Sequence, residues 1–176
     1  DRYIGVIQNI LKYSKEEEWF EFKENWFDAQ GIGEYISALS NAAAICKKDF
    51  AYLIWGINDK THEITGTTFN FKRDIKNEPL EHFLARQTTP DIAFAFYEVF
   101  FEERRLILLE IPKAKQIPTT FNNVRYIRIG SSKVNVAKYP EREAKLFEIL
   151  REKEKTIQNT PSEYQELTFE KLFTYY

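Results

Sequence analysis

Three acidic residues in the first third of the chain have the side chains that hard cations prefer as ligands. Glu16 precedes a short aromatic segment, Glu21 lies within it, and Asp59 follows a continuous apolar run from Ala51 to Ile57. Carboxylates that converge at neighbouring strand ends can bind a divalent cation or hold a basic partner. The sequence therefore predicts a charged site and leaves two chemistries open for it.

The aromatic segment after Glu16 is expected to form a strand, because Trp and Phe favour a pleated, half-buried surface. Alternation of side chains places Trp19, Glu21 and Lys23 on one face, and the two Phe residues between them in the core. Glu16 lies an odd number of residues before Glu21. It can therefore approach Glu21 only from a turn that precedes the strand.

The apolar run from Ala51 to Ile57 is typical of a central strand that is covered on both faces. It ends at Asn58-Asp59-Lys60, which has turn chemistry and predicts a hairpin with a second strand near Glu63 to Thr67. Small and apolar residues predict a helix from about Glu34 to Ile45 that lies close to the sheet.

The remaining elements alternate in a mixed order. We expect helices at Tyr3 to Lys12, Pro79 to Gln87 and Glu141 to about Lys155, and strands at Ala93 to Phe101, Arg105 to Ile111, Val124 to Ile129 and Lys133 to Val136. The fold class predicted is α+β, a mixed β-sheet with flanking helices. Residues 1–140 form one domain, and residues 141–176 supply a C-terminal helix and the start of a linker or following element.

Composition indicates an ordinary globular protein with a sizeable core. The chain has 176 residues, of which 43% are hydrophobic and 30% charged. The single cysteine, Cys46, has no disulfide partner within the chain, which fits a reducing, cytoplasmic setting. No apolar stretch approaches the ~20 residues of a membrane span. The chain contains no Met, so we expect a piece of a longer protein.

Nucleotide-binding loops are not evident in the sequence. Gly31-Ile32-Gly33 lacks the third glycine of a dinucleotide fingerprint, and no Gly-Lys-Ser/Thr loop that cradles phosphates exists. His62 and His82 stand alone and are expected to be ordinary polar residues. We therefore do not expect this segment to bind ATP.

Positive charge gathers in the second half of the chain, although the net charge is only −2. Between Arg104 and Lys138 there are eight basic residues and one acidic residue, Glu110. We call the following seven candidates the basic stripe: Arg104, Arg105, Lys113, Lys115, Arg125, Arg128 and Lys133. They could contact nucleic-acid phosphates, or they could protect the edges of a sheet from unwanted pairing.

Several short motifs in a fixed order resemble the Schlafen/AlbA-like domain family over roughly residues 5–138. The motifs are Glu16, Glu21-Phe22-Lys23, Ile36-Ser37-Ala38-Leu39-Ser40-Asn41, Tyr52 to Asp59, Glu63 to Thr67 and Tyr126 to Ser132. Two positions depart from the family pattern. Cys46-Lys47-Lys48-Asp49-Phe50 replaces a Gly-Gly pair, and Asn58 replaces the first Asp of the turn, whereas Asp59 retains the second.

The resemblance implies a nucleic-acid-binding domain, DNA or RNA, of a larger, transcription-regulatory, bacterial-type protein that needs no cofactor for binding. The alternative that it implies is a Mg²⁺- or Mn²⁺-dependent endoribonuclease in which Glu16, Glu21 and Asp59 hold the metal. Lys23 would pair with these carboxylates or orient a phosphate. A protein-interaction or oligomerisation domain remains a third alternative, and a homodimer and further domains of the full-length protein remain open.

Overall fold

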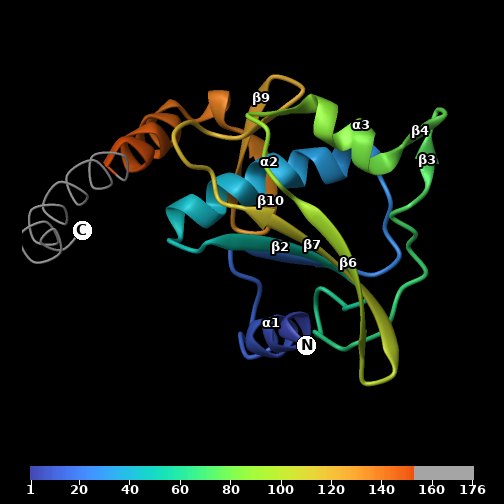
Figure 1. Ribbon diagram of the computed structural model, residues 1–176. Coiled ribbons are helices and arrows are strands. Elements are labelled where there is room, and N and C mark those ends of the chain that lie inside the picture. Colours follow the sequence, from blue (N-terminus) through green and yellow to red (C-terminus); the bar gives the residue numbers. More distant parts are fainter. Residues whose placement is uncertain (153–176) are drawn as a thin grey trace, which may run out of the picture.

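The structure, a computed structural model, describes residues 1–152, in which two four-stranded β-sheets have a long helix between them (Figure 1). One sheet has the order β1-β2-β7-β6, with β1 (Phe20–Lys23), β2 (Phe50–Trp55), β6 (Ala95–Phe101) and β7 (Arg104–Pro112). The other has the order β10-β9-β8-β5, with β5 (Thr88–Thr89), β8 (Thr120–Phe121), β9 (Val124–Ile129) and β10 (Ser132–Asn135). A small ladder joins β3 (Asp74–Ile75) to β4 (Glu78–Pro79).

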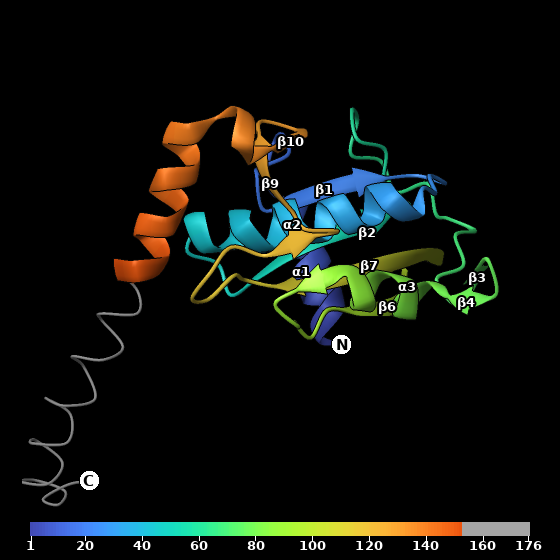
Figure 2. The same cartoon turned by 90° about the horizontal axis from the view of Figure 1, so that it is seen from above.

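The helices cover the sheets in layers. They are α1 (Arg2–Ile10), α2 (Ala29–Ile45), α3 (Leu80–Gln87), a short 3₁₀ turn at Val136–Lys138, and a helix over residues 140–152. α1 lies on the outer face of the first sheet, and α2 lies between the first sheet and the strands of the second (Figure 2). Within residues 1–152, no helix is both long enough and apolar enough to span a membrane.

The first sheet has the mixed topology that the sequence predicts. β1 and β2 run parallel and are joined through α2, whereas β2 and β7 run antiparallel. β2 therefore has a partner on each side, and its residues from Ala51 onward are buried. The α+β fold with flanking helices and an interior strand at Ala51 is confirmed.

α2 is longer than expected and begins at Ala29 rather than near Glu34. It is buried on nearly all sides because a sheet covers each of its two faces, which is the environment of an apolar helix in a core. Gly33 allows the second sheet to approach closely, since a Cβ at this position would lie 2.2 Å from the buried ring of Phe121. Gly31 and Gly33, which resemble a loop signal in the sequence, thus serve helix packing.

Polar side chains on α2 bind the backbone of the second sheet. The amide nitrogen of Asn41 donates to the carbonyl oxygens of Thr119 (3.0 Å) and Tyr126 (2.8 Å), and its oxygen accepts from the backbone N–H of Thr119 at 2.8 Å. Ser37 donates to the Thr119 carbonyl at 2.7 Å and accepts from the Tyr126 N–H at 2.9 Å. These buried groups are paired, as burial of polar atoms requires, and they fix the position of β9 over the helix.

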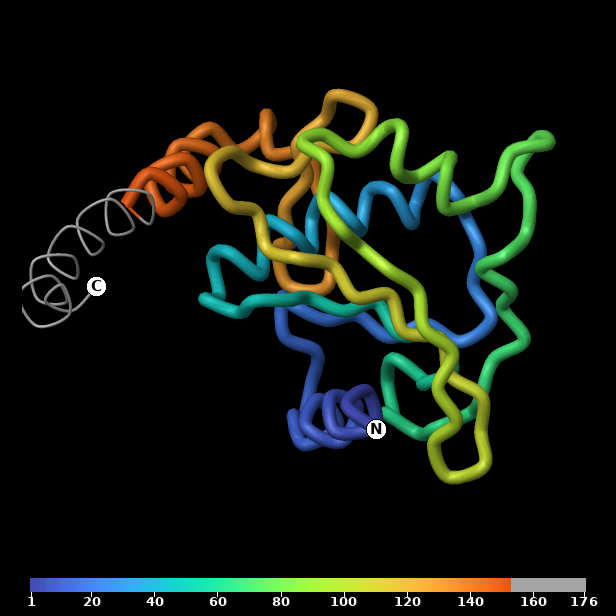
Figure 3. Tube along the Cα trace, in the orientation of Figure 1, coloured from blue at the N-terminus to red at the C-terminus, as the bar shows by residue number. Residues whose placement is uncertain are grey.

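The predicted hairpin partner at Glu63 to Thr67 does not form a strand. Only a single bridge, Ile57 with Ile64, remains of that pairing. Gly66 has φ of +77°, and its N–H donates to the carbonyl oxygen of Gly56. The next residue, Thr67, donates to the Arg105 carbonyl at 2.9 Å. The chain therefore turns away from β2 toward the β6–β7 hairpin, beside which it runs in Figure 3.

The C-terminal helix packs against the rest of the domain as far as the structure describes it. Leu146 and Leu150 are fully buried in a cluster that includes Ala44 of α2 and Ile127 of β9. Residues 140–152 confirm the start of the predicted helix. The end of that helix, near Lys155, and the predicted linker or following element lie outside the described residues.

Candidate functional site

Glu16 and Glu21 come together at the free edge of the first sheet. β1 is an edge strand, and β2 is its neighbour on one side. The backbone carbonyl oxygens of Trp19 and Lys23 point toward β2, where they accept the N–H groups of Tyr52 and of Gly56, the residue that follows β2. The N–H of Phe22 therefore points outward, and Glu16 accepts it at 2.5 Å from the turn before the strand. This is the bend that the spacing of Glu16 and Glu21 predicts, and it also covers an edge N–H.

Glu21 is not on a solvent-exposed face, which corrects the prediction for that side of β1. Its carboxylate is 5% exposed and forms an ion pair with Arg128 of β9, with Nη2 and Oε1 2.7 Å apart. The Arg128 side chain is fully buried. The prediction that Arg128 contacts phosphate at the surface is therefore wrong, because the second sheet and α2 enclose it.

The carboxyl of Glu16 is shifted toward its protonated form. Burial raises its pKa to about 7, and the nearby carboxylate of Glu21 contributes to the increase. The N–H of Phe22 and the guanidinium of Arg128 oppose this shift, since both stabilise the ionised form. Glu16 therefore exchanges its proton near neutral pH, beside the Glu21–Arg128 ion pair.

Three cationic side chains lie close to the ring of Tyr35. The ammonium of Lys133 lies 5.1 Å from the ring centroid, that of Lys23 lies 5.2 Å away, and the guanidinium of Arg128 lies 5.6 Å away. Burial and the Glu21 carboxylate raise the pKa of the Tyr35 phenol to about 12, so the ring stays neutral and attracts the cations through its π face.

The three cations differ in how far they are neutralised. Arg128 pairs with Glu21, and Lys133 pairs with Glu34 at 2.6 Å. Lys23 lies over Trp26 as well, 4.8 Å from its ring, and within the described part of the chain it has no carboxylate partner. Lys23 is also partly exposed, so it is the cation of this group that can meet an anion from solution.

Asp59 does not join the two glutamates. It lies exposed on the turn after β2, where the side-chain oxygen of Asn58 accepts the N–H groups of Lys60 and Thr61. Among residues 1–152, no group of three or more His, Cys, Asp or Glu side chains is arranged to hold a metal ion. The predicted metal site of Glu16, Glu21 and Asp59 is thus not formed, because Arg128 occupies Glu21 and the turn holds Asp59 outside the cluster.

The basic stripe is divided between the two sheets and does not form one surface. Arg104 and Arg105 lie at the β6–β7 hairpin, whereas Arg125, Arg128 and Lys133 lie on β9 and β10 (Figure 1). Five of its seven members have an acidic partner within 3.0 Å: Arg105 with Glu98, Lys113 with Asp49, Arg125 with Glu143, Arg128 with Glu21, and Lys133 with Glu34. Lys115 is exposed, and Arg104 contacts the carbonyl of Thr65 at 3.5 Å.

Glu34, Tyr35 and Trp26 are absent from the sequence-based prediction of the site. Glu34 and Lys133 are separated by 99 residues, and no local pattern marks them as partners. Trp26 and Tyr35 belong to an aromatic-rich stretch whose members serve the core as readily as a site. Their role becomes visible only when the second sheet is placed over α2.

Comparison with known proteins supports the motif-based resemblance. The sequence model described as Schlafen, AlbA_2 matches residues 16–137, well over half of the chain. Curated protein sequences give no match.

Two solved structures resemble this chain at low sequence identity. The DIP2311 protein of Corynebacterium diphtheriae is 17% identical with a TM-score of 0.49, and the match covers 77% of this chain and 26% of that one. The N-terminal domain of a Nitrosomonas europaea protein, named for its relation to the ATP-dependent DNA helicase RecG, is 20% identical with a TM-score of 0.45, and the match covers 73% of this chain and 89% of that one.

The family match starts at Glu16, ends just after β10, and includes both sheets and α2. The cation–aromatic group around Tyr35 lies within these limits. This chain belongs to the Schlafen AlbA_2 domain family.

Proposed function

We propose that this domain binds nucleic acid and that Lys23 is its central phosphate contact. Membership of the Schlafen AlbA_2 family supports a nucleic-acid-related role. The observation that carries the proposal is the position of the Lys23 ammonium, 4.8 Å from the ring of Trp26 and 5.2 Å from that of Tyr35. Two aromatic faces hold the cation in place without neutralising it.

This arrangement suits a phosphate because the ligand meets a positioned charge. A lysine that is free in solution loses side-chain entropy when it binds, whereas Lys23 already rests against two rings. A carboxylate partner would have to be displaced before a phosphate could bind, and Lys23 has none among residues 1–152. Each such contact releases counterions from the nucleic acid, which makes binding weaken as salt rises.

The remainder of the basic stripe has a different part in the proposal. Lys115 is exposed, so it can add a further phosphate contact. Arg105, Lys113, Arg125 and Lys133 are ion-paired and contribute less, because a phosphate must compete with a carboxylate that is already bound. The affinity should therefore depend on Lys23 more than on any member of the stripe.

Two further parts of the proposal rest on the family resemblance alone. The first is that the domain belongs to a larger, transcription-regulatory protein, and the second is that its partner is DNA or RNA. Metal-dependent cleavage is not included, because the three carboxylates do not form a site for Mg²⁺ or Mn²⁺. A protein-interaction domain would be favoured only by a failure to bind any nucleic acid.

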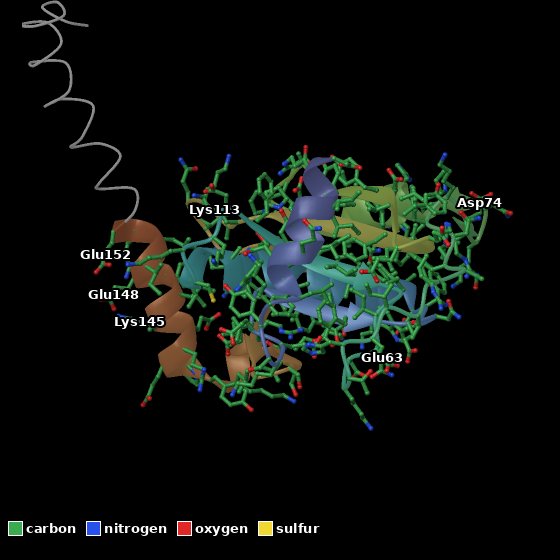
Figure 4. The ribbon with its side chains drawn as sticks, turned by 90° about the horizontal axis from the view of Figure 1, so that it is seen from below. Glu63, Asp74, Lys113, Lys145, Glu148 and Glu152 are labelled. Carbon is green, nitrogen blue, oxygen red and sulfur yellow. The ribbon has the colours of Figure 1, made fainter. Side chains whose placement is uncertain are left out.

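Fluorescence anisotropy with labelled single-stranded RNA, single-stranded DNA and duplex DNA tests the proposal across a salt series. Lys23→Gln should weaken binding about 5- to 10-fold and reduce the slope of log affinity against log salt by about one unit. Lys145→Gln is the matched control, since Lys145 lies on the helix over residues 140–152 at the end of the molecule opposite Asp74 (Figure 4). Equal affinities for the two variants, or no binding by the unmodified domain, would refute the proposal.

A further inference from the structure

A second cation lies over an aromatic ring beside the same loop. The guanidinium of Arg73 is 3.8 Å from the ring centroid of Phe27, which follows Trp26 in the segment between β1 and α2. Arg73 is exposed, and within residues 1–152 it forms no ion pair. Neither residue belongs to the charged group around Tyr35.

Arg73 and Phe27 line a pocket of about 400 Å³ between the loop that follows β1 and the segment that leads to β3. This volume lies at the lower end of the range for small-molecule sites, roughly 300–1,000 Å³. Phe69 forms the inner wall of the pocket and is 6% exposed. The pocket can therefore hold one small planar group.

A stack of rings makes the inner wall rigid. Phe69 stacks on Phe27 at 5.9 Å between ring centroids and on the fully buried Trp55 at 4.3 Å. Arg73 covers the outer end of this stack, so its guanidinium extends a column of planar groups that begins in the core. Such a column provides a surface on which a further planar group can stack.

The polar rim of the pocket is rich in hydrogen-bond donors. The side-chain oxygen of Asn25 is occupied by Thr67 and Thr68, and that of Asn70 by the N–H of Lys72. Both amide nitrogens therefore remain as donors without a partner in the described part of the chain. A ligand that stacks on Arg73 would meet these donors with its acceptor atoms.

The charges around the pocket limit the net charge that its ligand can carry. Arg73 and Asp74 both line the pocket and carry opposite charges. Lys72 does not line the pocket, but it is exposed and directly precedes Arg73 in the chain, so it adds a positive charge to the same segment. The three side chains together carry one net positive charge, which a ligand with a single negative charge would neutralise. A free nucleotide carries several negative charges, and the carboxylate of Asp74 would repel it. A nucleobase and its adjoining phosphodiester have the required planarity and charge.

We propose that this pocket binds one unpaired base of a single-stranded nucleic acid, with the base stacked against Arg73 and the adjoining phosphate near Lys72. The inference rests on the proposed function and names its partner as single-stranded DNA or RNA. A paired base cannot enter, because its faces are covered by its neighbours in the duplex. Single strands should therefore bind more tightly than a duplex of the same length.

The test uses a single-stranded oligothymidine with one 2-aminopurine, whose fluorescence falls when the base stacks. Arg73→Ala should lower the affinity about 5- to 100-fold, the effect of losing a base-stacking contact, and should abolish the quenching. Arg73→Lys retains the charge but not the plane, so it should lose quenching while keeping the salt dependence of the unmodified domain. Arg142→Ala is the matched control, because it removes an exposed arginine from the helix that carries Lys145, far from Asp74 (Figure 4).

The outcomes separate this inference from the proposed function. If the unmodified domain binds and the Arg73 and Arg142 variants behave alike, the base pocket is wrong and the Lys23 contact stands. If Arg73→Ala weakens duplex and single strands equally and quenching never occurs, Arg73 is only a phosphate contact and base binding is refuted. If the unmodified domain binds no nucleic acid, both proposals fall.

Discussion

Arg128 and Glu21 meet inside the protein, with Nη2 and Oε1 2.7 Å apart and with both side chains almost completely excluded from solvent. The three guanidinium nitrogens form no hydrogen bond of normal geometry within residues 1–152, and neither does Oε1. The contact is therefore held by charge. It joins β1 of one sheet to β9 of the other beside Tyr35 of α2, where the candidate site lies.

Breaking this pair from one side should be costly. Arg128→Ala leaves the Glu21 carboxylate buried without its counter-charge, and we expect the free energy of unfolding to fall by about 3–5 kcal/mol. Arg125→Ala on the same strand removes a half-exposed ion pair with Glu143 and should cost less than about 1 kcal/mol. Urea denaturation measures both. The double variant Glu21→Leu with Arg128→Met replaces both charges by apolar side chains and should recover much of the lost stability. Similar losses of stability for Arg128→Ala and Arg125→Ala would contradict a buried ion pair.

Glu16 should make folding stability depend on pH. Its pKa is about 7 in the folded protein against 4.5 as the ordinary value, so the folded state holds a proton that the unfolded chain releases. Stability is therefore complete below about pH 4.5 and decreases as the pH rises to 7. Because the carboxyl is partly exposed, the decrease should be on the order of 1–2 kcal/mol rather than the full linkage value.

The variant Glu16→Gln isolates this effect, since a Gln oxygen can still accept the N–H of Phe22. Its stability should match that of the unmodified protein at pH 5 and exceed it at pH 8 in thermal denaturation. Glu17→Gln, the same change at the neighbouring residue, serves as the control. A profile that Glu16→Gln leaves unaltered would mean that another group controls the titration.

Two glycines in helices should respond to alanine in opposite directions. Gly33→Ala places a methyl group 2.2 Å from the ring of Phe121, which is fully buried and cannot move aside, so we expect a loss of about 1–3 kcal/mol. Gly5→Ala in α1 meets nothing within 4 Å and should stabilise the protein by about 0.5–1 kcal/mol through helix propensity. Thermal melting of the two variants checks the sign, and a stabilising Gly33→Ala would show that the second sheet lies further from α2.

Metal should not produce cleavage by this domain. Asp59 lies on an exposed turn, apart from Glu16 and Glu21, so the chain does not provide three converging carboxylates. We expect gel assays with structured RNA to show no cut products when Mn²⁺ or Mg²⁺ is added, and we expect Asp59→Ala to bind nucleic acid as tightly as the unmodified domain. Metal-dependent cleavage that Asp59→Ala abolishes would restore the endoribonuclease alternative.

The sequence alone determined most of the longer helices and strands, but not the start of α2 at Ala29 or the absence of a strand at Glu63 to Thr67. The alternation of aromatic and charged residues from Trp19 to Lys23 predicts β1, and the apolar run from Ala51 predicts the interior strand β2. The odd spacing of Glu16 and Glu21 predicts the bend that lets Glu16 reach the edge of β1, where it accepts the N–H of Phe22. These features depend on local periodicity, which a sequence records directly.

Tertiary structure decided which charges face solvent. The side chains of β1 alternate as predicted, with Glu21 and Lys23 on one face of the strand. Glu21 is nevertheless buried, because Arg128 of the second sheet lies against this face. Arg128 belongs to a run of basic residues in the sequence, but its strand lies over α2 and its side chain points into the core. An ion pair between residues on different sheets leaves no periodic signal in either strand, so only the packing of the sheets around α2 reveals which cations remain for a ligand.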